Sequence, residues 1–148
     1  MISFTVDDFK KMKRMGEILG KEILKTAIKK ALVIGLVGQL GTGKTTFVQG
    51  LARGLSIKQR IISPSFVIIR KYKFPRKSRF SYFYHIDCYR ILTPKEMLEL
   101  DFKKILEENS VIAIEWAEKI KKILPGHTLW MNFDYIDKNK RKVTIIYE

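Results

Sequence analysis

Two glycines, a lysine and a threonine stand at a spacing that suits the binding of phosphate. The stretch Gly38-x-x-x-x-Gly43-Lys44-Thr45 meets the Walker A pattern at every required position. Glycines allow backbone N–H groups to turn inward around anionic oxygens, and the helix that follows adds the partial positive charge of its N-terminus. The lysine would reach the β- and γ-phosphates, and the threonine hydroxyl would ligate magnesium. The pattern therefore predicts a nucleoside triphosphate site with ATP and Mg²⁺ as cofactors.

A hydroxyl group further along the chain could join this site. Ser65 lies in the Ser-Pro-Ser segment 63–65, between the helix after the loop and the next predicted strand. Its hydroxyl could bond the γ-phosphate or a water on the magnesium; alternatively, Ser-Pro is simply a turn before a strand. The residues predicted to bind the nucleotide are therefore Gly38, Gly41, Thr42, Gly43, Lys44, Thr45, Thr46 and Ser65.

Two acidic residues end predicted strands and could complete the metal site. Glu115 closes the apolar run 111–114, and Asp87 closes the run 82–86. Magnesium takes oxygen ligands, and an acid beside such a loop usually stands at the carboxyl end of a neighbouring strand. We expect Glu115 to hold the metal or its water and Asp87 to share the metal or position the attacking water. The alternative for each is an ordinary strand-end acid.

The predicted catalytic residues are Lys44, Asp87 and Glu115, and the predicted metal-binding residues are Thr45, Glu115 and Asp87. His85 stands two residues before Asp87 and on a strand would point to the same face. It could form a hydrogen bond near the site, although an isolated strand histidine is more often structural.

The surrounding elements indicate an α/β fold. The apolar run 31–37 does not alternate, which is typical of a strand covered on both faces. A helix is expected at about 45–55, giving the order strand, glycine-rich loop, helix that a Walker A loop requires. Further strands are expected at 2–6, 66–74, 79–89, 110–115, 129–135 and 142–147. We expect a three-layer P-loop NTPase-like fold with a mixed, partly antiparallel central sheet, in a single domain over residues 1–148.

Helix starts are expected at two capping signals. Thr5 and Asp8 have the spacing of a capping box, and a long helix should follow them. Thr93 is expected to cap a helix that has Pro94 at its first position, with Glu96 near the positive end of the helix dipole.

Composition limits the cell compartment and the partners. No apolar run approaches the length of a membrane span, and Cys88 is the chain's one cysteine, so we expect a cytoplasmic protein with no membrane contact. The net charge of +14 suits nucleic acid or acidic partners, or else reflects genome bias or thermal adaptation. Basic residues crowd the hairpin 70–79 among aromatics, which suits RNA binding, a solvated hairpin whose aromatics face the core, or a surface for a partner protein.

Four sequence islands carry a resemblance to a known family. They are Gly38-Gln-Leu-Gly-Thr-Gly-Lys-Thr-Thr46, Ser63-Pro-Ser-Phe66, His85-Ile-Asp-Cys-Tyr-Arg90 and Ile114-Glu-Trp116 with Leu124-Pro125 after it. In this order, and over nearly the whole chain, they resemble the TsaE family, the ATPase component of bacterial tRNA threonylcarbamoyladenosine synthesis. The first island is generic to nucleotide-binding loops, whereas the third and fourth are much more specific.

The resemblance implies a weak, Mg-dependent ATPase that works with two partner subunits, TsaB and TsaD, and reaches tRNA at least indirectly through their complex. It implies nucleotide and metal positions at Lys44, Thr45, Asp87 and Glu115. Gln39 departs from the family, which usually has an acid there; a glutamine can neither act as a base nor bind a metal strongly. A second departure is Ser65, where threonine is usual, but the hydroxyl is kept.

Two other functions remain open from the residues alone. A small-molecule kinase would need an arginine-rich lid over its acceptor, and no clear lid segment appears between residues 107 and 124. The other alternative is a non-catalytic RNA-binding protein that uses ATP as a switch. An assay of phosphate transfer separates the three: release to water indicates the ATPase, transfer to a small acceptor indicates the kinase, and neither indicates the switch.

Overall fold

A single mixed sheet forms the centre of the fold. The structure is a computed structural model that describes residues 1–28, 30–62 and 68–147. Within these residues, seven strands form one sheet in the order β1-β7-β6-β2-β5-β4-β3. The strands are β1 (Ile2–Val6), β2 (Leu32–Gly38), β3 (Ile69–Lys73), β4 (Tyr82–Asp87), β5 (Ser110–Glu115), β6 (Leu129–Tyr135) and β7 (Arg141–Ile146).

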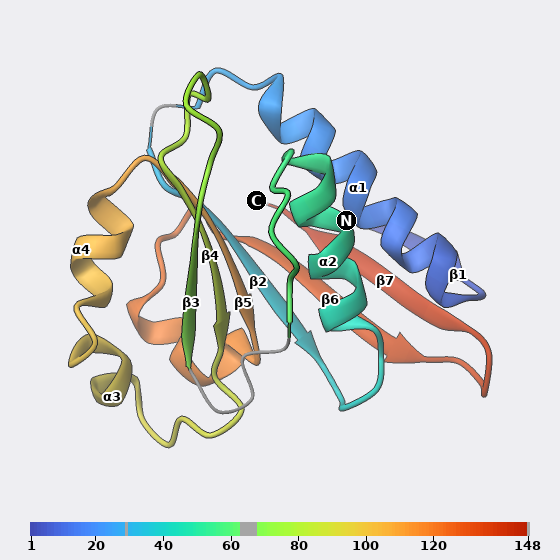
Figure 1. Ribbon diagram of the computed structural model, residues 1–148. Helices are drawn as coiled ribbons and strands as arrows, with labels where there is room; N and C mark the ends of the chain where they lie inside the picture. The colour runs from blue at the N-terminus through green and yellow to red at the C-terminus, as the bar shows by residue number, and fades with distance from the viewer. Residues whose placement is uncertain (29, 63–67, 148) are drawn as a thin grey trace.

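The middle of the sheet is parallel and its edges are antiparallel. β2 pairs in parallel with β5 and β6, and β4 pairs in parallel with β5. β3 with β4, β6 with β7, and β1 with β7 run antiparallel. The predicted mixed sheet with two hairpins is confirmed. The parallel pairs matter most for the site, because they bring the carboxyl ends of β2, β4 and β5 to the same end of the sheet (Figure 1).

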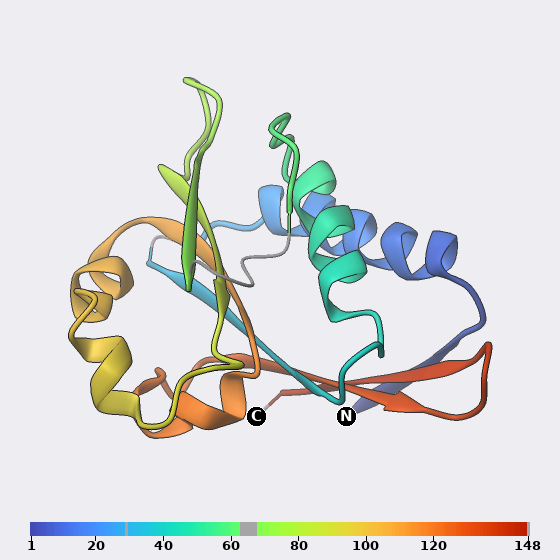
Figure 2. The same cartoon turned by 60° about the horizontal axis from the view of Figure 1, so that its bottom comes forward.

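Helices cover the sheet on both faces, as the three-layer prediction requires (Figure 2). On one face lie α1 (Phe9–Leu24) and α2 (Lys44–Gly54). Between these helices and the sheet lies a buried apolar cluster that includes Phe47 and Leu51 of α2 and Phe133 of β6. On the other face lie α3 (Pro94–Leu98), α4 (Phe102–Glu107) and the 3₁₀ helix η1 (Ala117–Ile123), around a second cluster. No helix in the described part of the chain combines the length and apolar character that a membrane crossing needs.

The two helices of the first layer touch backbone to backbone. A Cβ atom added to Gly50 would lie 1.9 Å from the carbonyl oxygen of Lys13, and one added to Gly54 would lie 2.1 Å from that of Glu17. On the facing helix, a Cβ on Gly16 would lie 2.2 Å from the carbonyl oxygen of Phe47. These glycines let α1 lock against α2, the helix that begins at the Walker A lysine.

The helix starts differ in one case from the prediction. Asp8 alone caps α1, since its carboxylate accepts from the backbone N–H of Lys11 at 2.7 Å, while Thr5 lies inside β1. The expected start of α3 is confirmed, because Glu96 accepts a hydrogen bond from the backbone N–H of Thr93 at 3.0 Å. The region after Pro94 forms two short helices, because Asp101 turns the chain in the left-handed region at φ 60°.

Candidate functional site

The glycine-rich loop joins β2 to α2 and needs its glycines. Gly41 and Gly43 have φ angles of 80° and 100°, which side-chain-bearing residues rarely adopt. Contacts exclude a side chain as well: a Cβ on Gly41 would lie 2.8 Å from the hydroxyl of Tyr135, and a Cβ on Gly38 would lie 2.5 Å from the carbonyl oxygen of Phe133. The loop is therefore held against α1 and β6 in a conformation that only glycine allows.

Lys44 lies inside the curve of this loop. Its side chain is buried, and its ammonium donates to the carbonyl oxygens of Gly38 at 2.5 Å and Gln39 at 2.9 Å. The ammonium also sits 4.7 Å from the ring centroid of Trp116. Burial lowers the pKa of Lys44, and the negative charge of Glu115 partly offsets that effect. A buried cation with only carbonyl and ring partners is well suited to meet an incoming anion.

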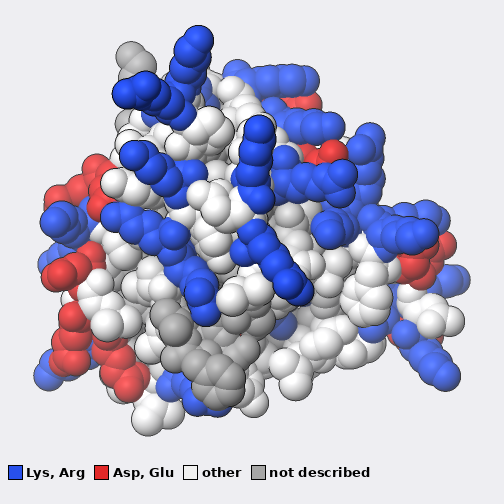
Figure 3. All heavy atoms as spheres, viewed as in Figure 1, with Lys and Arg blue, Asp and Glu red and all other residues white. Residues whose placement is uncertain are grey.

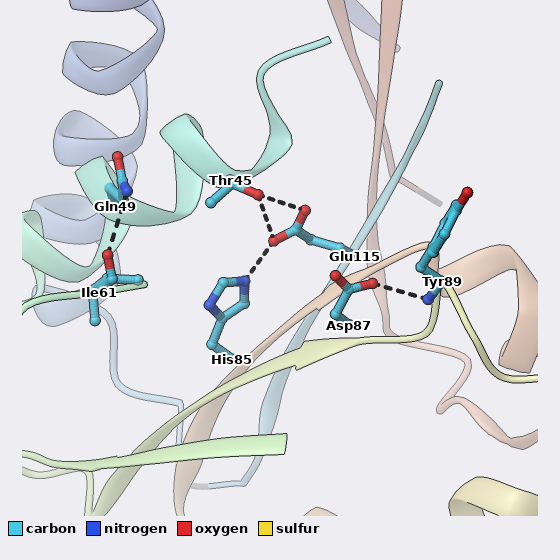
Figure 4. A network of polar contacts seen from close by, with 7 residues as sticks. All are labelled: Thr45, Gln49, Ile61, His85, Asp87, Tyr89 and Glu115. Atoms are coloured by element: carbon cyan, nitrogen blue, oxygen red, sulfur yellow. Dashed lines mark hydrogen bonds and ion pairs between the residues drawn. The ribbon is translucent and has the colours of Figure 1, made fainter. Parts of the chain in front are cut away.

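Glu115 forms the centre of a hydrogen-bond network, drawn in Figure 4. The hydroxyl of Thr45 donates to its carboxylate oxygens at 2.9 and 3.1 Å, and Nε2 of His85 lies 2.5 Å from Oε2. A proton on Nε2 would let the histidine donate to this carboxylate oxygen. Both His85 and Glu115 are buried, which leaves the carboxylate with a fixed orientation.

Asp87 stands beside Glu115 on the neighbouring strand. The two residues are direct partners in the parallel register of β4 and β5. The Asp87 carboxylate accepts from the backbone N–H of Tyr89 at 2.9 Å. Burial raises the pKa of Asp87; the Tyr89 hydrogen bond lowers it, and the neighbouring Glu115 raises it again. Two carboxylates so placed favour a proton or a cation between them.

A pocket of about 350 Å³ brings these groups together. That volume lies within the range of roughly 300–1,000 Å³ usual for small-molecule sites. Its walls come from the loop, the start of α2 and the ends of β4 and β5. The lining residues are Phe9, Leu40, Gly41, Gly43, Lys44, Thr45, Thr46, Asp87, Tyr89, Arg90, Glu115 and Trp116.

Most of the residues predicted from the sequence line this pocket, with three exceptions. Gly38 is not among the lining residues, although its carbonyl oxygen accepts a hydrogen bond from the Lys44 ammonium. Thr42 is buried within the loop, where its hydroxyl donates to the carbonyl oxygen of Gln39 at 2.7 Å. Ser65 lies outside the described residues. The contact of His85 with Glu115 gives that histidine a partner in the site. In the sequence, the only indication that His85 belongs to the site was its position two residues before Asp87 on the same strand.

Two aromatic residues from the family islands, Tyr89 and Trp116, line the pocket, although the sequence predicted no role for either. The rings of Tyr89 and Trp116 lie 5.1 Å apart, and Trp116 adopts a left-handed backbone conformation with φ 58°. Lys119 lies 5.4 Å from the Tyr89 ring and donates to the Tyr89 carbonyl oxygen. The two rings thus form one wall of the pocket, with the ammonium groups of Lys44 and Lys119 beside it.

The protein groups fit a metal ion that arrives with a nucleotide. Among residues 1–28, 30–62 and 68–147, no three His, Cys, Asp or Glu side chains are grouped to hold a metal by themselves. Magnesium is commonly bound through one or two carboxylates together with substrate phosphates. This donor set is present in the pocket. The Thr45 hydroxyl lies 2.9 Å from a carboxylate oxygen of Glu115, and Asp87 is the partner of Glu115 on the neighbouring strand.

The basic hairpin does not offer its aromatics to bases. Tyr72, Phe74 and Phe80 are buried in the core, as the solvated-hairpin alternative requires. Arg79 is engaged with α1, since its guanidinium donates to the Ile23 carbonyl oxygen at 3.1 Å.

Comparisons with known proteins agree over almost the full chain. The family model described as threonylcarbamoyl adenosine biosynthesis protein TsaE matches residues 6–143. The tRNA threonylcarbamoyladenosine biosynthesis protein TsaE of Haemophilus influenzae is 31% identical over 146 residues, covering 99% of this chain and 89% of that protein. The Treponema pallidum protein of the same name is 30% identical over 132 residues, covering 89% and 90%. The crystal structure of YdiB from Bacillus subtilis superimposes with a TM-score of 0.76 at 27% identity, covering 99% of this chain and 84% of that one.

Proposed function

Because this chain belongs to the TsaE family, whose role is in tRNA threonylcarbamoyladenosine biosynthesis, we propose that it binds ATP with Mg²⁺ and hydrolyses ATP in support of that modification. The observation that carries the proposal is the meeting of Lys44, Thr45, Asp87 and Glu115 in one pocket. The partners in this proposal are the TsaB and TsaD subunits, tRNA is reached through their complex, and the compartment is the cytoplasm.

The loop and Lys44 bind the phosphates. Backbone N–H groups of the glycine-rich loop and the N-terminus of α2 surround the anion. The ammonium of Lys44, now on the carbonyl oxygens of Gly38 and Gln39, exchanges these partners for phosphate oxygens. This exchange needs no rearrangement of the backbone, because the ammonium already lies in the curve of the loop.

Thr45 and Glu115 are the residues that would bind the Mg²⁺ ion of the nucleotide. Bound Mg²⁺ supplies positive charge that offsets the charge of the phosphate oxygens. The Thr45 hydroxyl and the Glu115 carboxylate would hold the ion, and the contact with His85 keeps the Glu115 carboxylate in place. His85 is thus a positioning residue for Glu115.

Asp87 orients the attacking water. Its carboxylate faces the same pocket and its raised pKa makes it a better proton acceptor than an ordinary aspartate. The negative Glu115 beside it contributes to that raised pKa. Since the attacking group in this proposal is water, phosphate is released rather than transferred to an organic acceptor.

Titration calorimetry with ADP and Mg²⁺, followed by a phosphate-release assay with ATP, tests the proposal. Lys44→Ala should weaken binding at least about tenfold, because a buried charge-assisted contact is lost. Lys95→Ala, an exposed lysine on α3, serves as the matched control and should change nothing. Added TsaB and TsaD should raise the rate of phosphate release by the wild-type protein.

Three results would count against the proposal. Equal nucleotide affinity in the Lys44 and Lys95 variants would show that Lys44 and its loop do not bind the phosphates. Phosphate transferred to a small acceptor would indicate a kinase instead. Tight nucleotide binding without phosphate release, even with TsaB and TsaD present, would indicate an ATP-dependent switch.

A further inference from the structure

A second hollow lies on the α1/α2 face, away from the nucleotide pocket. It has a volume of about 310 Å³ and shares none of its lining residues with that pocket. The C-terminal half of α2, one turn of α1 and the segment that follows α2 form its walls. Its lining residues are Lys13, Gln49, Ala52, Arg53, Ile57, Lys58, Gln59, Arg60 and Ile61. We call this hollow the basic groove.

The charge of the basic groove is of one sign. Four of its described lining residues are Lys or Arg, and none is acidic. Among residues 1–28, 30–62 and 68–147, none of these four cations forms a salt bridge. The nearby acid Glu17 is already engaged, because Lys21 lies 3.2 Å and Arg14 3.6 Å from its carboxylate. Figure 3 shows Lys and Arg side chains crowded over this face; most acidic side chains lie toward its left and right edges, and a few lie among the basic ones at the upper right.

The fold sets these cations in place before any ligand arrives. The backbone contact between Gly50 and Lys13 brings α1 against α2 at this point. Ile57 and Ile61 are buried, and the side-chain amide of Gln49 donates to the Ile61 carbonyl oxygen at 3.3 Å. The segment is therefore anchored at both ends, and residues 58–60 between the anchors are all exposed.

We propose that the basic groove binds the phosphate backbone of an RNA strand. Electropositive grooves that follow a backbone are the usual device for binding nucleic acid without reading its bases. An acidic protein is the less suitable occupant, because protein interfaces have aromatic or apolar anchors at their centre. The groove has no aromatic residue among its lining residues, and its three apolar ones, Ala52, Ile57 and Ile61, are buried. The excess of positive charge over the whole chain, +14, would attract the same ligand to the protein. This binding does not depend on ATP hydrolysis.

Fluorescence anisotropy with a labelled, unmodified tRNA transcript across a salt series measures the proposed contact. The groove variant carries Lys13→Gln, Lys58→Gln and Arg60→Gln; Arg53 is retained because its charge helps to lower the pKa of Glu17. The matched control loses the same charge from the opposite helix layer. It carries Lys95→Gln, Lys103→Gln and Lys122→Gln, all at exposed positions. Magnesium-ADP affinity, measured in parallel, should stay at the wild-type value in both variants and verifies that each is folded.

The groove variant should bind the transcript at least about tenfold more weakly than the control at moderate salt. Its slope of log affinity against log salt should fall by about 2 to 3, since each lost phosphate contact removes about 0.7–0.9. Polyglutamate of similar length, used as a second probe, should lose much less affinity. Equal effects of groove and control variants on RNA would overturn the proposal. So would a loss of polyglutamate binding as large as that of RNA, which would assign the groove to an acidic protein.

Discussion

One added methyl group at Gly50 would force α1 and α2 apart. The Cβ of Gly50→Ala would lie 1.9 Å from the carbonyl oxygen of Lys13, and 2.7 Å from its carbonyl carbon. Carbon and oxygen in van der Waals contact need about 3.2 Å or more, and neither partner is a flexible side chain. The helices would therefore have to separate by roughly 1 Å along their closest line, which loosens the packing of both against the sheet.

Two opposing effects set the size of the loss. Alanine in place of glycine inside a helix contributes about 1 kcal/mol in favour of folding. Overpacking typically costs about 1–3 kcal/mol, and the upper end applies here because backbone must move. We therefore expect the free energy of unfolding to fall by about 1–2 kcal/mol, and the melting temperature to fall by about 2–8 °C for a chain of this size.

Urea unfolding followed by circular dichroism measures this difference. Gly126→Ala is the matched control, because a Cβ at Gly126 would meet nothing within 4 Å. Its stability should be unchanged or slightly higher. A Gly50→Ala protein that is as stable as the wild type, or more stable, would show that helix propensity outweighs the contact and that the two backbones do not touch as described.

Three further predictions concern the site. Glu115→Gln should lower the rate of phosphate release by about 100-fold or more while nucleotide binding persists, because the amide keeps the shape but lacks the charge; a fall in melting temperature with normal turnover would make the residue structural. Asp87→Asn should raise the free energy of unfolding at pH 7, with the gain shrinking toward pH 4. The pKa of Asp87 in the folded protein lies above the ordinary 3.8, so its carboxyl contributes full stability below that value and loses it as the pH rises through the folded-state pKa; an unchanged gain at pH 4 would contradict this cause. The buried Cys88, whose pKa burial raises to about 12, should react with a thiol reagent at pH 8 only after denaturation, and rapid reaction in the native protein would show that the thiol is accessible.

Local patterns were enough to predict the loop and its two acids. Gly41 and Gly43 need positive φ angles, a requirement of the chain itself that a sequence motif can carry. Asp87 and Glu115 end apolar runs, and parallel strands bring such ends to the same edge. The sequence could therefore predict that both acids lie at the end of the sheet where the loop is, although not that they are direct partners on neighbouring strands.

Contacts between distant segments could not be predicted in the same way. The contact of His85 with Glu115 depends on β4 lying next to β5 in one register, which nothing within either strand specifies. The meeting of Gly16 with α2 depends likewise on the docking of two helices. At the start of α1, local signals competed: Thr5 and Asp8 both suit a cap, and the pairing of β1 with β7 takes Thr5 into the sheet.

The position of Trp116 has a practical consequence for studying this protein in solution. Its indole ring lies beside the Lys44 ammonium, and the chain's other tryptophan, Trp130, lies on β6 with its ring 5.7 Å from the Lys121 ammonium. Indole emission responds to a charge that moves nearby, and an ammonium that turns toward phosphate is such a charge. If the chain binds a nucleotide as proposed, the emission of Trp116 should change on binding, and Trp130→Phe would leave Trp116 as the sole emitting indole.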